Sequence, residues 1–259
     1  MVEVVFHRGG YLSNTNYDSN DVKIITRHVQ SKNPVLIEGF PGIGLVGNIA
    51  GQYIIDEMKM EYIGSIESRY FPSIAVLYEG LINMPVRIYE NAEHNLIIVI
   101  SDIPISHAVS YDFSNALVDW AKSIEVKEVV SIAGIEIMDS SHKVFGAATT
   151  PEILEKIKDK VEISQMGTIS GISGSIMSEC LLRGIPALSL LGTIKTQNPD
   201  SRAASSVIEV LNELYGFSVN IQGLIEQAES IEIELQRLAK DVQTTEQKGE
   251  VKNEFSMYE

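Results

Sequence analysis

Short apolar runs alternate with segments of helical spacing along most of the chain, and this alternation limits the possible folds more than any other feature. Residues 34–38 form one such run, which has the length of a buried strand and stops at Gly39. Residues 45–58 and 111–123 each carry their apolar side chains on one face of a helix. Buried strands separated by helices form mostly parallel sheets covered on both faces. The sequence therefore predicts an α/β fold with a mostly parallel or mixed central sheet flanked by helices.

The same patterns predict the remaining elements. Further strands are expected at residues 2–6, 62–67, 74–78, 86–89, 96–100, 128–133, 144–148 and 187–191, and further helices at residues 151–160, 175–183 and 201–215. The strands between residues 62 and 100 have no helices between them, which predicts an antiparallel or mixed part of the sheet. The polar stretch 9–21 predicts a loop. No linker or repeat interrupts residues 1–220, so we expect one α/β domain there.

The pattern changes after residue 220 to that of a single helix over residues 221–243. Its apolar residues recur at steps of four and three, at Leu224, Ala228, Ile231, Leu235, Leu238 and Val242. Such a heptad seam is typical of helices that pack along one stripe. Two interpretations stay open, a last helix packed on its own domain and a helix that pairs subunits. Residues 244–259 are polar without apolar periodicity, and we expect a flexible tail.

The charge balance limits the possible partners. The chain has 35 acidic and 20 basic residues and a net charge of −15. An acidic surface repels phosphate backbones and anionic lipids, so we expect neither nucleic acid nor membrane as a partner. The first residues lack the layout of a signal peptide, and no apolar run approaches the about 20 residues of a membrane span. We therefore expect a cytoplasmic protein.

Neither metal nor cofactor is expected from the residue pattern. Cys180 is the one cysteine, which excludes an internal disulfide and a CxxC motif. The five histidines show no spacing typical of metal ligands. Catalytic chemistry is therefore limited to two glycine-containing turns.

The first turn, residues 42–47, matches the dinucleotide fingerprint G-x-G-x-x-G, follows a strand and opens a helix. Glu67 lies 20 residues past Gly47, where an acidic partner for a ribose is expected. However, Pro41 interrupts the turn, and no arrangement of His, Cys, Lys or Tyr suggests hydride chemistry. We favour a structural role, in which glycines allow tight turns and close packing. The residues of this structural turn are Gly39, Pro41, Gly42, Gly44 and Gly47.

The second turn, residues 167–175, is the other candidate site for binding or catalysis. Its Gly171-Ile172-Ser173-Gly174 resembles a nucleophile elbow, but Ser175 stands where that motif needs glycine. The turn could still hold an anion at a helix N-terminus. The alternative is thus an enzyme or sensor that binds a nucleotide, a nucleoside or phosphate at one of the two turns.

The string Pro-Val-Leu-Ile-Glu-Gly-Phe-Pro-Gly-Ile-Gly-Leu-Val-Gly at residues 34–47 resembles the opening of the proteasome assembly chaperone family, in its archaeal branch. Later landmarks of that family are similar to Phe71-Pro72, Gly134-Ile135 and Asn198-Pro-Asp-Ser-Arg-Ala-Ala204. The resemblance implies a fold related to nucleoside phosphorylases, self-association, a structural glycine turn and no known catalytic activity. Residues 190–196 depart from the family, in which aromatic residues are expected in the stretch just before the position of Asn198.

The sequence ends in Met257-Tyr258-Glu259, which resembles the hydrophobic-Tyr-any motif that docks ring activators and some archaeal assembly chaperones on the proteasome. A terminal carboxylate can be captured by a lysine or by backbone amides. Tyr258 adds a flat ring with a hydroxyl, and Met257 adapts to an irregular apolar wall. The expected partners are the α subunits of the proteasome core particle, bound by several tails of a homo-oligomer. The sequence does not choose between assisting assembly and opening the gate.

Overall fold

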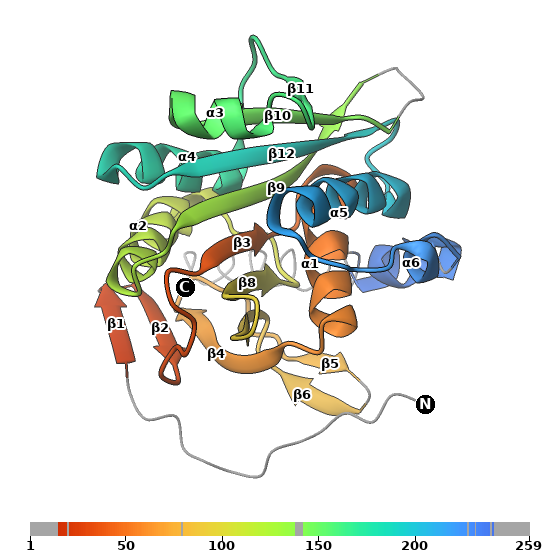
Figure 1. Cartoon of the computed structure of the whole chain (residues 1–259). Helices are drawn as coiled ribbons and strands as arrows, with labels where there is room; N and C mark the ends of the chain where they lie inside the picture. Colours follow the sequence, from red (N-terminus) through yellow and green to blue (C-terminus); the bar gives the residue numbers. More distant parts are fainter. Residues whose placement is uncertain are drawn as a thin grey trace, which may run out of the picture.

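The computed structural model describes residues 15–19, 21–78, 80–137, 142–226, 228–230, 232–238 and 240. A ten-stranded sheet with the order β1-β2-β4-β7-β8-β3-β9-β12-β10-β11 runs through the molecule (Figure 1). Its strands are β1 (Thr15–Ser19), β2 (Val22–Thr26), β3 (Val35–Gly39), β4 (Glu61–Ser68), β7 (Val86–Asn91), β8 (Leu96–Ser101), β9 (Glu128–Glu136), β10 (Val144–Ala148), β11 (Glu162–Ile163) and β12 (Ala187–Ile194). A separate two-stranded hairpin consists of β5 (Val76–Tyr78) and β6 (Leu81–Asn83).

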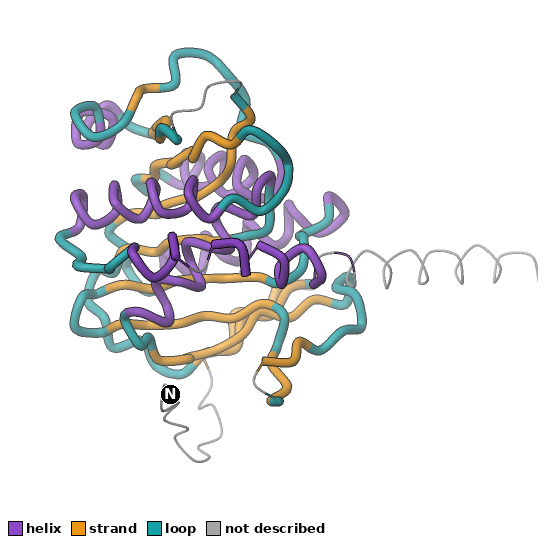
Figure 2. The backbone as a smooth tube through the Cα atoms, turned by 90° about the vertical axis from the view of Figure 1, so that its right-hand side faces the viewer, coloured by secondary structure: helices purple, strands orange, loops and turns teal. Residues whose placement is uncertain are grey.

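Helices cover both faces of the sheet (Figures 1 and 2). The helical elements are η1 (Ile43–Leu45), α1 (Val46–Glu57), α2 (His107–Ser123), α3 (Pro151–Ile157), α4 (Gly171–Arg183), α5 (Ser201–Tyr215) and α6 (Gln222–Glu226). One core cluster joins α2 and α4 to the sheet, and a second joins α1, α3, α5 and α6 to it. The expected α/β fold is therefore confirmed.

The sheet is mixed, as the sequence predicts. Strands β8, β3, β9 and β12 are parallel neighbours, and every residue of β3, β8 and β12 is buried. Antiparallel pairs join β1 to β2, β2 to β4, β4 to β7 and β7 to β8. The helix-free stretch after α1 supplies three of these strands, because neighbouring antiparallel strands need only short connections.

Local signals place several helix ends where the sequence predicts them. The Asp200 side chain accepts a hydrogen bond from the Ala203 amide at 2.9 Å and caps α5, and Gly216 ends that helix at φ 70°. Pro151 stands in the first turn of α3, and Gly184 ends α4 at φ 68°. A glycine adopts this left-handed backbone at no steric cost, so the stop signals work without tertiary help.

Other boundaries differ from the predictions. Strand β1 lies inside the stretch 9–21, which we expected to be a loop, and it is held by antiparallel pairing with β2. Helix α2 begins at His107 rather than 111, and α4 begins at Gly171 rather than 175. Strands β2, β6 and β11 were not predicted. The strand expected at residues 2–6 lies outside the described residues.

Candidate functional site

The glycine turn lies at the carboxyl end of β3 and is packed tightly against its surroundings. A Cβ added at Gly39 would lie 2.5 Å from the Gly47 carbonyl oxygen, and one at Gly47 would lie 2.5 Å from the Ile132 carbonyl oxygen of β9. Real Cβ atoms do not approach backbone this closely. These two glycines therefore let α1 pack directly on β3 and β9.

The middle of the turn makes further contacts within the chain. Gly44 adopts φ 68°, and its carbonyl accepts a hydrogen bond from the Asp200 amide at 2.9 Å. A Cβ there would lie 2.9 Å from a methyl carbon of Ile194 at the end of β12. A Cβ at Gly42, by contrast, would meet nothing within 4 Å, and Pro41 is partly buried. The turn thus joins β3, β12 and the start of α5, as a structural turn requires.

Glu67 does not lie where a dinucleotide site would need it. It stands in β4, and β7 and β8 separate that strand from β3. In the dinucleotide fold, the strand that carries the acidic residue lies next to the strand before the glycine turn. Glu67 therefore cannot serve as the acidic partner of the fingerprint.

A buried carboxyl, Glu38, connects three elements immediately before the turn. Ser173 of α4 donates to its Oε1 at 2.6 Å, Ser131 of β9 donates to the same oxygen, and the Phe40 amide donates to Oε2 at 3.3 Å. Glu38 is 0% exposed. Burial raises the pKa of Glu38 from 4.5 to about 7, while the three hydrogen bonds act in the opposite direction.

Glu38 changes the chemistry expected at the second turn. The Ser173 hydroxyl donates its hydrogen bond to the buried Glu38 carboxyl, and Ser173 is itself buried, so its oxygen is directed into the core and not toward a substrate in solvent. The carboxyl also lies against the first turn of α4, where the alternative function would place an anion. Cys180 of the same helix is fully buried, and burial followed by the charge of Glu38 raises its pKa to about 12. It therefore stays a thiol at neutral pH.

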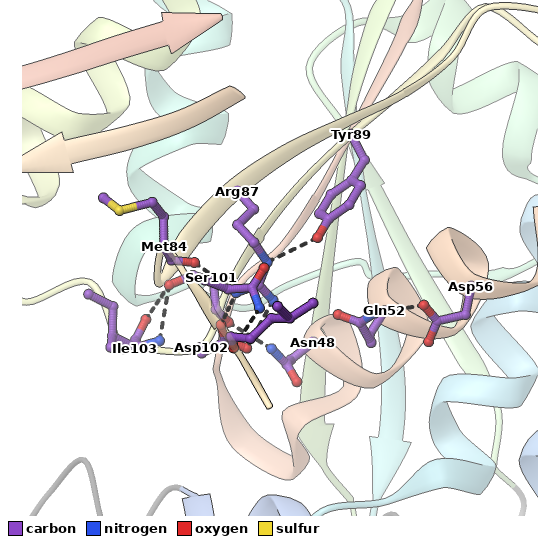
Figure 3. A network of polar contacts seen from close by, with 11 residues as sticks. Asn48, Gln52, Asp56, Met84, Arg87, Tyr89, Ser101, Asp102 and Ile103 are labelled. Atoms are coloured by element: carbon purple, nitrogen blue, oxygen red, sulfur yellow. Dashed lines mark hydrogen bonds and ion pairs between the residues drawn. The ribbon is translucent and has the colours of Figure 1, made fainter. Parts of the chain in front are cut away.

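A second polar network lies at the carboxyl end of β8 (Figure 3). Arg87 of β7 forms an ion pair with Asp102, and it donates to the Met84 carbonyl at 2.8 Å and to the Tyr89 hydroxyl at 3.2 Å. The side chains of Arg87 and Asp102 are 7% and 11% exposed. Asn48 of α1 donates to the Ser101 carbonyl at 2.7 Å. These contacts connect the residue that follows the β5–β6 hairpin to the end of β8.

The heptad residues of the last helical segment lie partly against the chain's own core. Helical residues 228–230, 232–238 and 240 follow α6. Leu224 is 0% exposed, Leu235 packs against the core cluster of α1 and α5, and Ala228 and Leu238 are partly buried. Ile231 lies outside the described residues. The contacts of Leu224 and Leu235 favour packing on the same domain, and pairing between subunits stays a prediction.

The predicted docking residues Met257, Tyr258 and Glu259 lie outside the described residues. Within the part of the chain that the structure describes, no group of three or more His, Cys, Asp or Glu side chains could hold a metal ion. No helix among the described residues is long and apolar enough to cross a membrane.

The sequence of this chain matches a known family over most of its length. A model of the PAC2 family matches residues 36–239. The chain belongs to the PAC2 family. An uncharacterized protein of Methanocaldococcus jannaschii is 35% identical over 230 residues, which cover 89% of this chain and 94% of the relative.

Solved structures similar to this PAC2-family protein come from Pyrococcus furiosus. PbaA, an archaeal homolog of proteasome-assembly chaperone, gives a TM-score of 0.80 at 31% identity and covers 87% of this chain and 99% of its own. PbaB, an archaeal proteasome activator, gives a TM-score of 0.72 at 23% identity and covers 85% of this chain and 99% of its own. At that identity PbaB shows the fold alone. The resemblance to the archaeal branch of the proteasome assembly chaperone family is confirmed.

Sequence reasoning missed the two buried polar networks of this PAC2-family protein. Glu38 offered a signal, because a charged residue stands directly after three apolar ones in a predicted buried strand. Its partners Ser131 and Ser173 are distant in sequence and carried no signal. Arg87 and Asp102 stand at the paired ends of the consecutive strands β7 and β8, and their ion pair depends on the register of that hairpin.

Proposed function

We propose that this PAC2-family protein binds the α ring of the proteasome core particle through C-terminal tails ending in Met257-Tyr258-Glu259, and acts there as an assembly chaperone or regulator. The observation that carries the proposal is the likeness of nearly the whole body to PbaA, an archaeal homolog of proteasome-assembly chaperone, at 31% identity. The tail adds the means of contact, because its last residues resemble the proteasome-docking motif.

Each tail supplies a small set of contacts. A terminal carboxylate that accepts charge-assisted hydrogen bonds contributes roughly 1.5–3 kcal/mol. The Tyr258 ring adds apolar area, and its hydroxyl can find a partner in the same pocket. Met257 fits an apolar wall of irregular shape. One tail therefore binds weakly.

An oligomer makes weak tails effective. Several tails on one body raise the apparent affinity by about 10²–10⁴ if they can engage together. If residues 241–259 form the flexible tail expected from the sequence, each tail would reach roughly 20–25 Å from the body. We therefore propose a homo-oligomer in which each subunit carries one tail and several tails bind the ring at the same time.

Capture of purified core particles by the immobilised protein tests the tail. The intact chain, a chain lacking residues 257–259, and the single variants Tyr258→Ala and Tyr111→Ala should be compared. Tyr111 is 68% exposed on α2 and serves as the matched control on the body. We expect the first two changes to abolish capture or reduce it strongly, and Tyr111→Ala to leave it intact.

A chain with one alanine added after Glu259 isolates the terminal carboxylate, because it keeps all three side chains and displaces the charge by one residue. It should lose capture as the truncation does. Equal capture by the intact, truncated and extended chains would contradict the proposed role of the tail.

Peptide hydrolysis by mature core particles separates the two modes of action. Gate opening predicts faster hydrolysis of a fluorogenic peptide when the protein is added, and this increase should depend on Tyr258. Assistance of assembly predicts no increase, but a higher yield of complete particles from separated α and β subunits. A protein that changes neither hydrolysis nor assembly would contradict both.

A further inference from the structure

The β5–β6 hairpin lies apart from the main sheet (Figure 1), and several of its apolar side chains are exposed. Leu77 and Ile82 face each other across the two strands and are 72% and 76% exposed. Leu81 and Met84 are 43% and 38% exposed. We refer to residues 76–78 and 80–84 as the hairpin arm. Large apolar side chains that cluster in an exposed hairpin mark an interaction surface.

Two short strands are too few to be stable alone. Each strand of the arm has three residues, and among the described strands β5 and β6 pair only with each other. An isolated two-stranded hairpin is marginally stable in water unless further strands or packing support it. Its outer edges also carry backbone groups that can pair with another chain. The arm therefore gains stability when a partner covers it.

The base of the arm is fixed where the chain leaves β6, so the arm leaves the body from a defined position. The Arg87 guanidinium holds the Met84 carbonyl and the Asp102 carboxylate together (Figure 3). The Asp102 amide also donates to the Pro85 carbonyl at 2.9 Å. A fixed base reduces the conformational entropy that the arm loses when it binds.

The distribution of charge along the chain favours a second copy of the chain as the partner of the arm. Residues 70–86 contain a single charged residue, Glu79, whereas 21% of the whole chain is charged and its net charge is −15. Two copies that meet through acidic surfaces repel each other. Two copies that meet through the arm bring together apolar, nearly uncharged surfaces, and their acidic surfaces can stay apart.

We propose that the hairpin arm is the surface through which copies of this chain associate. The inference deepens the proposed function and rests on it in one respect, because several tails act together only on an oligomer. A second copy covers Leu77 and Ile82 and supplies the packing that the two strands lack.

The oligomeric mass of full-length variants tests the proposal. Leu77→Thr and Ile82→Thr, made together, place β-branched residues that favour strands at both positions and remove the exposed apolar surface. Leu182→Gln is the matched control, because Leu182 lies on α4 and is 76% exposed, as Ile82 is. Mass should be measured by light scattering over a range of concentrations, and thermal unfolding should confirm that each variant is folded.

We expect the unchanged protein and Leu182→Gln to be oligomers. The arm variant should have a dissociation constant for self-association at least tenfold higher than that of either protein. The association should also strengthen between about 0.05 M and about 0.5 M NaCl, because salt screens the repulsion between acidic copies. An arm variant with unchanged mass and concentration dependence would overturn the proposal, as would a monomeric unchanged protein.

The arm proposal and the proposed function of the tail can fail independently of each other. If the arm variant dissociates but removal of residues 257–259 leaves core-particle capture unchanged, the tail role is wrong and the arm proposal stands. If truncation abolishes capture while the arm variant keeps its mass, the arm proposal is wrong and the tail role stands.

Discussion

Glu38 stands in the central strand β3 with no exposed surface, and its environment opposes ionisation. The desolvation of a carboxylate outweighs the hydrogen bonds from Ser131, Ser173 and the Phe40 amide, so the pKa of Glu38 rises to about 7. In the unfolded chain the carboxyl titrates near its ordinary value. The folded chain therefore binds one more proton than the unfolded chain between about pH 4.5 and about pH 7.

Glu38→Gln should remove this proton-linked part of the stability. Below about pH 4.5 the stabilisation from a protonated Glu38 is fully present, and it is lost as the pH rises through about 7. A shift from 4.5 to about 7 corresponds to about 3 kcal/mol. Urea unfolding from pH 4.5 to pH 8 should show the free energy of unfolding of the unchanged protein falling by this amount relative to that of the variant. A difference that is constant across this range would contradict the assigned burial.

Gly47→Ala tests whether the glycine turn is a packing device. Alanine normally stabilises a helix relative to glycine by about 0.5–1 kcal/mol. Here its Cβ would lie 2.5 Å from the Ile132 carbonyl oxygen, so we expect a loss of about 1–3 kcal/mol or more. Gly42→Ala is the control, because its Cβ meets nothing within 4 Å and its φ is −144°. Equal unfolding midpoints for the two variants would contradict the packing role.

Among the elements, the β7–β8 pair holds the base of the hairpin arm through a buried ion pair. Arg87→Met would leave Asp102 buried without its partner, at a cost of about 3–5 kcal/mol. Arg27→Met is the matched control, since the Arg27–Glu61 pair is 42% and 53% exposed and such pairs contribute about 0–1 kcal/mol. Chemical denaturation of both variants checks this, and faster hydrogen exchange in residues 76–84 is expected for Arg87→Met alone. Similar losses in the two variants would argue against a special role for Arg87.

The last helical segment offers a prediction that separates its two interpretations. Leu235 packs against the core formed with α1 and α5. Leu235→Glu should therefore lower the free energy of unfolding by about 1–3 kcal/mol and leave the oligomeric mass unchanged. Unfolding curves and light scattering on the same samples measure both effects. Dissociation at unchanged stability would instead assign this helix to subunit pairing.

Elements with local signals were predictable, and elements held by distant contacts were not. Helix α5 carries its own cap at Asp200 and its own stop at Gly216, and both ends were found from the sequence. The first turn of α4 is Gly171-Ile172-Ser173-Gly174, which has poor helix formers, and Ser173 is held there by Glu38. Strand β1 is polar and depends on its pairing with β2. Its sequence therefore has no apolar alternation that would indicate a strand.

At the scale of the whole molecule, the alternation of strands and helices predicted the α/β class and the mixed sheet. The strand order was not predictable, because it depends on which distant segments pair. That order argues against a dinucleotide site at the glycine turn, since it places Glu67 three strands away from the turn, beyond β8 and β7. The contact of Arg87 with Asp102 depends instead on the register of the β7–β8 hairpin, which the spacing of residues alone did not fix.

The binding of the oligomer to proteasome core particles tests the central claim most directly. The dissociation constant should be measured for the intact protein and for the chain lacking residues 257–259, with both shown by light scattering to have the same mass. The tail mechanism predicts that truncation weakens binding by a factor on the order of 10² or more, because all tails are lost together. Equal dissociation constants for the two proteins would contradict it.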